Sequence, residues 1–401
     1  MPAAIPLTQS ITWVGANDRE TELFEGIWPL PRGVSYNSYL IAGEKVALVD
    51  TVKHTSFERH LEKIRQTIGD RTVDYLIINH MEPDHSGSVN LLLNVFPELK
   101  IVGNKKTADF LSRFYGVRSN VVTVEDRGEL DLGTHKLIFN LTPMVHWPET
   151  MMTYDSTDKV LFSGDAFGGF GALDGGIFDD EVDLGYFEDE ILRYFSNIVA
   201  KYAVMVEKAI TKISDLEIGI VASTHGPVWR KDPGAIISRY ARWSRHEAEE
   251  GVTIVYGSMY GNTERMMEAV AQGLAEEEVS RIRIHNVSKT HVSYLIRDAW
   301  RFRALLLGSP TYDTRLYPPM DYFVKLIEHK MLKNRILGLF GTYGWSGGGV
   351  GTLTEFAKNS SCELVEPVVE AQCAPTAEDL KACRLLGQNI VKRLKASPKT
   401  A

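Results

Sequence analysis

The sequence predicts an α/β protein with two domains, and three observations support this prediction. Short apolar runs typical of buried strands alternate with segments of helical apolar spacing along most of the 401 residues. In the first half, side chains able to bind a metal follow several of these runs. In the second half, which begins with a new strand after residue 250, the runs lead into loops rich in glycine, hydroxyl and aromatic residues. We therefore expect one domain over residues 1–250 and another over residues 251–401.

The composition narrows the class of protein. Hydrophobic residues make up 44% and charged residues 24%, as in soluble globular proteins, and the net charge of -8 argues against nucleic-acid or anionic-membrane partners. No apolar run is long enough to predict a membrane span, and the N-terminal segment lacks the features of a signal peptide. The three cysteines, Cys362, Cys373 and Cys383, lack the paired spacing of a zinc knuckle or a rubredoxin-type iron site. We expect a cytoplasmic protein.

The first domain is predicted to begin with short strands and then to alternate strands with helices. Gly43–Lys45 separates two apolar runs and indicates a hairpin, and Ser56 is the expected cap of the first helix. The predicted elements are strands at 39–42, 46–50, 75–79 and 100–103 and helices at 56–68 and 89–96. The alternation continues to about residue 225.

Four side chains able to bind a metal lie within six residues, directly after the predicted strand at 75–79. They are His80, Glu82, Asp84 and His85. Any one of them alone is better explained as a polar loop residue or a helix cap. All four together favour a metal site, and nitrogen and oxygen ligands without a thiolate suit iron, manganese or zinc.

Three further candidate ligands follow later strands. His146 comes after residues 137–141, Asp165 directly after 160–164, and His225 directly after 218–224. A lone histidine in such a position is more often structural. Combined with the hexapeptide, however, these residues complete a set of four histidines and three carboxylates. Seven ligands are enough for two metals if one carboxylate bridges them.

The order His-x-x-x-Asp-His, then His, Asp and His, resembles the metallo-β-lactamase superfamily over about the first 250 residues. That resemblance implies an αββα sandwich, with two mixed sheets flanked by helices. One departure is informative, because the hydrolases of that superfamily usually carry His-x-His-x-Asp-His and this chain has Glu82 at the second histidine. A carboxylate in place of a neutral nitrogen favours ferric iron over zinc, and therefore redox chemistry over hydrolysis. The alternative is that Glu82 orients a zinc ligand without binding metal.

The second domain is expected to begin after a joining helix at 235–249. A strand at 252–256 leads into the loop 257–263 and then a helix at 264–275. Backbone amides at the helix N-terminus, with the Ser258 and Thr263 hydroxyls, can hold a phosphate without a lysine. The chain has neither GxxxxGK[ST] nor GxGxxG, so this is not a nucleoside-triphosphate loop, and the dinucleotide interpretation is weakened. An ordinary capped turn is the alternative.

Two later loops favour a planar ligand. They follow predicted strands at 303–308 and 336–340, at the strand ends where open parallel sheets bind ligands. Glycines allow close backbone approach, and Tyr312, Tyr343 and Trp345 offer stacking surfaces, although any of them could simply be packing. Ser-x-Tyr-Gly-Asn-Thr at 258–263 resembles the phosphate loop of flavodoxin, which implies a doubly wound parallel sheet and bound FMN.

The flavodoxin resemblance implies two sets of FMN contacts, without assigning the aromatic residue that stacks on the ring. The phosphate set is Ser258, Met259, Tyr260, Gly261, Asn262 and Thr263. The ring set is Ser309, Pro310, Thr311, Tyr312, Tyr343, Gly344, Trp345, Ser346 and Gly347.

The two halves together resemble the flavodiiron proteins, a family of oxygen and nitric oxide reductases, over almost the whole chain. The resemblance implies that His80, Glu82 and His146 bind one iron, that Asp84, His85 and His225 bind a second iron, and that Asp165 bridges them. Some members leave the equivalent of His85 unbound. The implied activity is reduction of O2 to water, of NO to N2O, or of both, with FMN relaying electrons. Tyr194 is either a proton donor beside the irons or a core residue.

Family resemblance also implies partners. We expect a head-to-tail homodimer or a dimer of dimers, in which one subunit's flavin faces the other's irons. The sequence ends at Ala401 without a rubredoxin or flavin-reductase extension, so we expect a separate electron donor, either rubredoxin or a reduced deazaflavin. The preference between the two gases is not encoded in a recognisable motif. The alternative functions are a metal-dependent hydrolase fused to a flavin module, and an FMN electron carrier or redox sensor.

Overall fold

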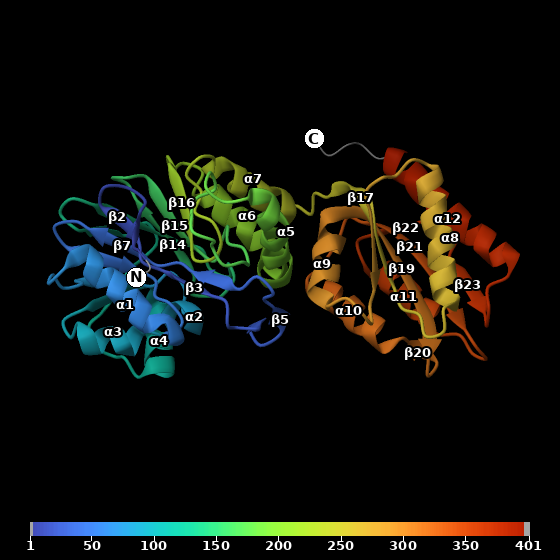
Figure 1. Ribbon diagram of the computed structural model, residues 1–401, viewed down its shortest axis with the longest axis horizontal. Helices are drawn as coiled ribbons and strands as arrows, with labels where there is room; N and C mark the ends of the chain where they lie inside the picture. The colour runs from blue at the N-terminus through green and yellow to red at the C-terminus, as the bar shows by residue number, and fades with distance from the viewer. Residues whose placement is uncertain (1–2, 397–401) are drawn as a thin grey trace. The chain divides into compact units, whose positions relative to one another are not determined.

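The computed structural model describes residues 3–396, and the chain forms two compact units, Met1–Ala241 and Arg242–Ala401 (Figure 1). Met1 and Pro2, which begin the N-terminal segment without signal-peptide features, lie outside the described residues, and so does the terminal Ala401. The two units divide within a helix, nine residues before the predicted boundary at 250/251. That boundary stays a prediction about which segment folds and functions alone.

The first unit contains two main sheets and the helices around them. Its elements, including the helix that runs across the division, are β1 (Ile5–Pro6), β2 (Ile11–Trp13), β3 (Ala16–Asp18), β4 (Leu23–Phe24), β5 (Trp28–Pro29), β6 (Val34–Tyr36), β7 (Tyr39–Ala42), β8 (Val46–Val49), η1 (His54–Ser56), α1 (Phe57–Ile68), β9 (Tyr75–Ile77), α2 (Pro83–Ser86), α3 (Val89–Val95), β10 (Lys100–Gly103), α4 (Lys105–Tyr115), β11 (Val121–Thr123), β12 (Glu129–Asp131), β13 (Lys136–Leu141), β14 (Met151–Asp155), β15 (Val160–Gly164), α5 (Leu184–Tyr194), η2 (Phe195–Val199), η3 (Ala200–Tyr202), α6 (Ala203–Lys212), β16 (Ile220–Ser223) and α7 (Pro233–Ser244).

Both main sheets of the first unit are mixed, as the αββα prediction requires. One has the order β1-β2-β7-β8-β9-β10-β11, antiparallel up to β8 and parallel from β8 to β11. The other has the order β12-β13-β14-β15-β16, in which only β15 and β16 are parallel. Helices α1, α3 and α4 lie together on one side of the unit, and α5, α6 and α7 lie on another (Figure 1).

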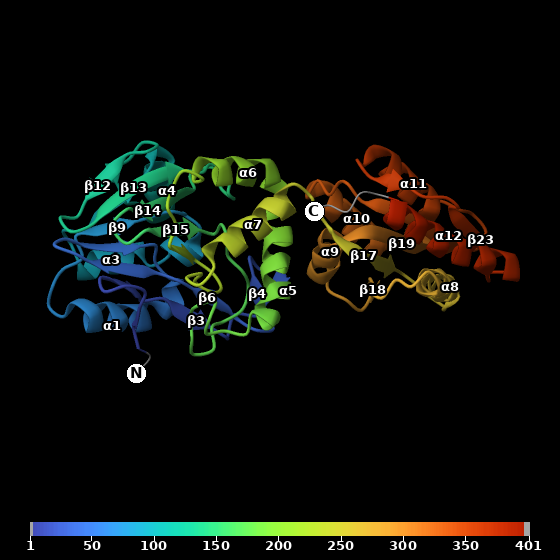
Figure 2. The same ribbon diagram turned by 90° about the horizontal axis from the view of Figure 1, so that it is seen from above.

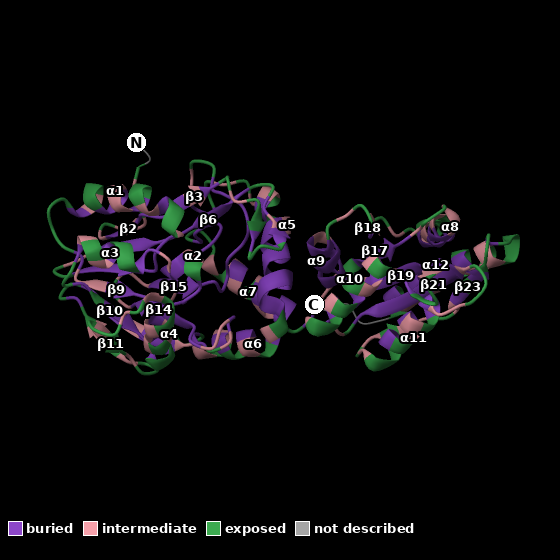
Figure 3. Cartoon of the chain, turned by 90° about the horizontal axis from the view of Figure 1, so that it is seen from below, coloured by how far each residue is buried: buried purple, intermediate pink, exposed green. Residues whose placement is uncertain are grey.

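The seven-stranded sheet is held to its helices by an apolar core. Ile64 of α1, Leu92 of α3 and Leu111 of α4 are fully buried against strand residues such as Leu48 and Leu76. Figure 3 shows the central strands mostly buried, with exposed residues at the edges and on the outer faces of the helices. This burial is the main source of stability of the layer, since apolar area removed from water contributes roughly 25 cal/mol per Å².

The second unit is a parallel sheet covered on both faces by helices. Its elements are β17 (Glu249–Tyr256), α8 (Asn262–Glu276), β18 (Ile282–Asn286), α9 (Val292–Arg301), β19 (Phe302–Tyr312), β20 (Arg315–Leu316), α10 (Pro318–His329), β21 (Ile336–Tyr343), α11 (Gly349–Asn359), β22 (Glu363–Leu364), β23 (Val369–Gln372) and α12 (Ala377–Ala396). The order β18-β17-β19-β21, continued by β22 and β23, is the 2-1-3-4-5 order of flavodoxin-like folds.

Alternating residues of β17 face the two helical layers of this sheet. Val252 and Ile254 pack in the cluster formed with α8 and α12, whereas the Thr253 hydroxyl donates to the Asp298 carbonyl of α9, at 2.8 Å. Helices α9 and α10 accordingly lie across the sheet from α8 and α12 (Figures 1 and 2). The predicted fold class is confirmed for both halves.

Several local predictions were wrong. Ser56 stands at the N-cap position of α1, as predicted, but it makes no side-chain cap bond, and the 3₁₀ turn η1 leads directly into α1. The helix predicted to reach residue 249 ends at Ser244, and β17 begins at Glu249. Strands β19 and β21 extend through part of the predicted loops to Tyr312 and Tyr343, because β20 pairs with the end of β19 and β23 with the end of β21. Within the described residues, no helix combines the length and apolar character needed to cross a bilayer.

Candidate functional site

The seven predicted metal ligands come together from ends of strands in both sheets of the first unit. His80 follows β9, and Asp165 and His225 follow β15 and β16. The ligand atoms form two groups, and within each group they lie within 4.8 Å of one another. One group is His80, Glu82, His146 and Asp165, and the other is Asp84, His85 and His225.

Asp165 connects the two groups through its two oxygens. Its Oδ2 lies 3.1 Å from His146 Nε2 and 3.6 Å from His80 Nε2. Its Oδ1 lies 2.9 Å from His85 Nε2 and 3.6 Å from His225 Nε2. One carboxylate oxygen therefore faces each group, which is the geometry of a bridging ligand.

Contacts behind the ligands fix their orientation. His80 Nδ1 donates to Glu149 Oε1 at 2.8 Å, and His225 Nδ1 donates to the Ser35 carbonyl at 2.7 Å, so Nε2 of each ring is the nitrogen that faces the other ligands. The Thr224 hydroxyl donates to Asp165 Oδ1 at 2.6 Å. Within the described residues His85 Nδ1 is buried without a hydrogen-bond partner, so the ring of His85 is the least constrained of these three.

The electrostatics of the site favour a bound cation. Burial acts to lower the pKa values of His85 and His146, but the carboxylates around them, Asp165 foremost for His146 and Asp84 for His85, outweigh burial and raise both to about 9. Burial acts in the opposite direction on Asp165, yet the neighbouring histidines hold its pKa well below its usual value. Asp165 thus retains its negative charge although it is buried, and positive charge must balance it.

The donor atoms also fit a metal pair. Both Asp84 oxygens and the Nε2 atoms of His85 and His225 are buried without a hydrogen-bond partner in the described structure, although Asp84 Oδ2 lies 3.3 Å from each of these two nitrogens. Buried polar atoms are rarely left unpaired, so atoms that converge without bonding one another are best satisfied by a shared cation. Imidazole and carboxylate ligands without thiolate suit iron, and the residues therefore fit two irons.

Tyr194 lies in an aromatic wall beside the second group. Its ring centroid is 5.5 Å from that of His225, and Phe24 and Phe170 pack against it. The side chain is fully buried and, in the described residues, its hydroxyl has no hydrogen-bond partner. Burial, and then the charge of Asp165, raises the pKa of Tyr194 well above its usual value, so the hydroxyl keeps its proton. Its role as a proton donor stays a prediction.

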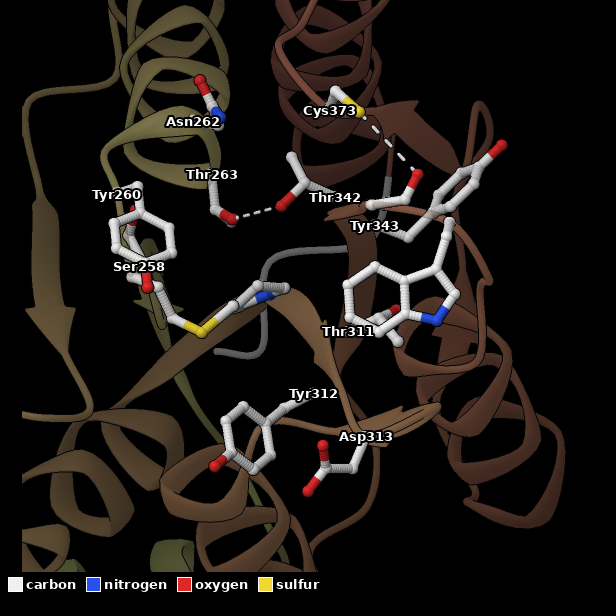
Figure 4. A pocket seen from close by; sticks show the side chains of 14 residues that line it. Ser258, Tyr260, Asn262, Thr263, Thr311, Tyr312, Asp313, Thr342, Tyr343 and Cys373 are labelled. Carbon is white, nitrogen blue, oxygen red and sulfur yellow. Dashed lines mark hydrogen bonds between the residues drawn. The ribbon is translucent and has the colours of Figure 1, made fainter.

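The predicted flavin residues surround a cavity of about 400 Å³ in the second unit (Figure 4). The lining includes eleven of the fifteen predicted residues: Ser258, Met259, Tyr260, Asn262, Thr263, Pro310, Thr311, Tyr312, Tyr343, Gly344 and Trp345. Thr263 and Thr342 point toward each other at one end, with their hydroxyl oxygens 2.9 Å apart, and Tyr312 and Asp313 lie on the opposite wall (Figure 4).

The remaining four predicted residues support the loops rather than line the cavity. Gly261, with φ of +86°, precedes α8 in a left-handed conformation that favours glycine, and its N–H donates to the Ser258 hydroxyl. The Ser309 hydroxyl is buried and donates to the Pro310 carbonyl. Ser346 and Gly347 lie in the loop before α11.

Sequence reasoning missed four residues at the two sites. Asp313, Thr342 and Cys373 line the flavin cavity. Asp313 and Thr342 stand within the loops singled out from the sequence, whereas Cys373 follows β23, for which no signal was available. Glu149 lies three residues after His146, but nothing local indicates that it reaches His80, 69 residues earlier.

The fold and the sites define a class of protein: a β-lactamase-like unit with a paired histidine and carboxylate site, followed by a flavodoxin-like unit with a flavin-sized cavity. Family models agree with this division. Residues 34–226 match the model of the ODP family beta lactamase, and residues 254–387 match that of flavodoxin.

Similar proteins identify the family more closely. The anaerobic nitric oxide reductase flavorubredoxin of Vibrio vulnificus is 34% identical over 97% of this chain and 79% of its own length. The nitric oxide reductase of Moorella thermoacetica is 34% identical over 98% of this chain and 100% of its own. Among solved structures, rubredoxin oxygen:oxidoreductase from Desulfovibrio gigas has a TM-score of 0.93 at 28% identity, covering 98% of this chain and 99% of that one. The flavodiiron protein from Giardia intestinalis has a TM-score of 0.93 at 28% identity, covering 99% and 98%. This chain belongs to the flavodiiron protein family, whose members are oxidoreductases.

Proposed function

We propose that this chain reduces nitric oxide to N2O, dioxygen to water, or both, at a pair of irons that receive electrons through FMN from an external donor. The observation that carries the proposal is the position of Asp165, with one oxygen facing each histidine and carboxylate group. Relatives named as nitric oxide reductases and an oxygen oxidoreductase support both substrates.

The proposed ligand sets follow the two groups. His80, Glu82 and His146 would hold one iron, Asp84, His85 and His225 would hold the other, and Asp165 would be shared between them. When bound, the two irons supply one electron each and hold two diatomic molecules close together, and the coupling of two NO consumes two electrons and two protons to give N2O and water.

The protein around the site controls access and water. Glu82, Asp84 and His146 are the partly accessible ligands, so the small substrates enter on their side, whereas His80, His85 and His225 are fully buried. On the His225 side, Phe24, Phe170 and Tyr194 form an apolar wall that excludes water.

The second unit holds FMN in the proposal. Residues 258–263 and Thr342 bind the phosphate end, with the N-terminus of α8 adding its dipole. Tyr312 and Trp345 lie at the ring end, and Trp345 is 86% exposed, which leaves the flavin accessible to a donor. The part that folds and binds FMN alone is proposed to be residues 251–401, with residues 1–250 as the metal domain.

The proposed partners follow from the family. We place the enzyme in the cytoplasm as a head-to-tail homodimer or a dimer of dimers, in which one subunit's flavin faces the other's irons. Rubredoxin or a reduced deazaflavin supplies the electrons.

The test is anaerobic turnover of the purified protein with its iron and FMN contents measured. We expect about two irons and one FMN per chain, and we expect chemically reduced protein to be reoxidised by NO with N2O formation, by O2 without accumulation of peroxide, or by both. Zinc in place of iron, or reduced protein that neither gas reoxidises faster than free FMN, would contradict the proposal.

A further inference from the structure

Glu149 is a carboxylate that contacts a proposed ligand, His80, without being a proposed ligand itself. It lies between β13 and β14 and is 1% exposed. Its Oε1 accepts two hydrogen bonds, from His80 Nδ1 at 2.8 Å and from the Met81 N–H at 2.9 Å. Its carbonyl accepts from the Asn104 side chain at the start of α4, which fixes the loop itself.

The second carboxylate oxygen of Glu149, Oε2, differs from the first in its hydrogen bonding. Oε2 is buried and has no hydrogen-bond partner in the described residues. A buried carboxylate that is bonded through only one oxygen retains charge that neighbouring groups must balance. The His80 ring connects Glu149 to the first ligand group, because Nδ1 donates to Glu149 while Nε2 faces Glu82 and Asp165. A cation held by that group would supply the balancing charge.

The partners behind the other histidines differ. His225 Nδ1 donates to a neutral backbone carbonyl, that of Ser35, and His85 Nδ1 is buried without a hydrogen-bond partner among the described residues. Of these three rings, only His80 donates to a carboxylate. A carboxylate behind an imidazole makes it a stronger electron donor to a metal than a carbonyl does.

We propose that Glu149 is a positioning residue that makes the two metal positions unequal, so that the His80–Glu82–His146 position binds its metal more tightly. Glu149 holds the proton on Nδ1 of His80, aims Nε2 at the metal, and adds negative charge to a ligand set that already contains Glu82. This inference rests on the proposed ligand sets and adds an order of binding to them.

The test compares two substitutions at one position. Glu149→Gln retains an oxygen that accepts from His80 and Met81 and removes only the charge, whereas Glu149→Ala removes both. The matched control is Glu125→Gln. Glu125 is an exposed carboxylate in the wall of a second cavity, which residues on either side of Glu149 also line. Metal-free full-length proteins are titrated anaerobically with ferrous iron, and the ⁵⁷Fe-loaded proteins are compared by Mössbauer spectroscopy. Circular dichroism and thermal melting of the same samples report folding of the first unit, because the FMN cavity lies in the second.

We expect two unequal binding steps in the native protein. Glu149→Gln should weaken the tighter step about 10-fold and Glu149→Ala about 100-fold, while the weaker step and the Glu125→Gln control stay unchanged. One of the two iron signals should change and the other should not. Equal binding steps in the native protein, an unchanged tighter step in Glu149→Gln, or equal changes in both iron signals would each overturn the inference. If native protein binds no iron at all, the proposed function fails first, which distinguishes the two failures.

Discussion

The metal-ligand groups and the flavin cavity both lie at strand ends, yet the chain builds them differently. Among the proposed metal ligands, His80, His85 and His225 are fully buried, whereas Tyr260 and Trp345 of the flavin cavity are 91% and 86% exposed. The metal ligands are separated by up to 145 residues, counted from His80 to His225, and are fixed by side-chain bonds across two sheets. The flavin cavity is lined by residues within 258–263, by the ends of β19 and β21 with the residues that follow them, and by Cys373 after β23, all at strand ends of one sheet. The comparison teaches that the metal site depends on long-range tertiary structure and the flavin site on local loop conformation.

The largest effect should come from Asp165→Ala, which removes the carboxylate shared by the two groups. We expect loss of both irons and a fall in gas reduction of about 1,000-fold or more, since one substitution removes a ligand from each metal. FMN should remain bound because its cavity lies in the other unit. Iron analysis and visible spectra check this, with the exposed Asp174→Ala as control. Retention of two irons in Asp165→Ala would show that Asp165 does not bridge.

Thr263→Trp should have the opposite effect: it should weaken FMN binding and leave the iron content unchanged. Thr263 is 1% exposed and its hydroxyl lies against that of Thr342, so the larger ring has no room. We expect FMN affinity to fall about 10- to 100-fold, as overpacking of 1–3 kcal/mol implies, with iron unchanged. Thr263→Ser, which keeps the hydroxyl, should bind FMN almost normally. Flavin fluorescence during titration measures the affinity. Equal affinities in the Trp and Ser variants would show that Thr263 is not part of the phosphate site.

Glu82→His tests why the metal site favours iron. The substitution replaces a charged oxygen ligand with a neutral nitrogen, which suits zinc and no longer stabilises ferric iron. We expect zinc to replace much of the iron and gas reduction to fall at least about 10-fold, while FMN stays bound. Metal analysis after growth with both metals is the measurement. A variant with two irons and full activity would show that Glu82 is not a ligand.

The smallest expected effect is a difference in melting temperature between two fragments of the second unit. Arg335, 1% exposed, donates to the His246 carbonyl at 3.0 Å, and Trp300 Nε1 donates to the Trp243 carbonyl at 3.2 Å. Residues 251–401 lack both acceptors, whereas residues 242–401 keep them. We expect both fragments to bind FMN, with a melting temperature about 3–8 °C lower for the shorter one. If only the longer fragment binds flavin, the boundary at 250/251 is wrong.

The sequence predicted the fold class and the seven candidate ligands because each ligand stands directly after an apolar strand or a short turn. Spacing alone did not predict which ligands belong to the same group. The family resemblance supplied that division. Glu149 and Cys373 were missed because their contacts depend on how distant strands are placed. The helix predicted to reach residue 249 was too long, because the chain leaves α7 at Ser244 and β17 begins at Glu249, which pairs with Phe302.

The most direct test of the account is the yield of N2O from fully reduced protein without an external donor. Reduced FMN holds two electrons and two ferrous irons hold two more, and each N2O consumes two. With excess NO, native protein should yield about two N2O per chain, Thr263→Trp from which the weakly bound FMN has been removed about one, and Asp165→Ala none above background. An equal yield from native protein and Thr263→Trp would show that flavin electrons do not reach the irons. A full yield from Asp165→Ala would show that the paired metal site is not where NO is reduced.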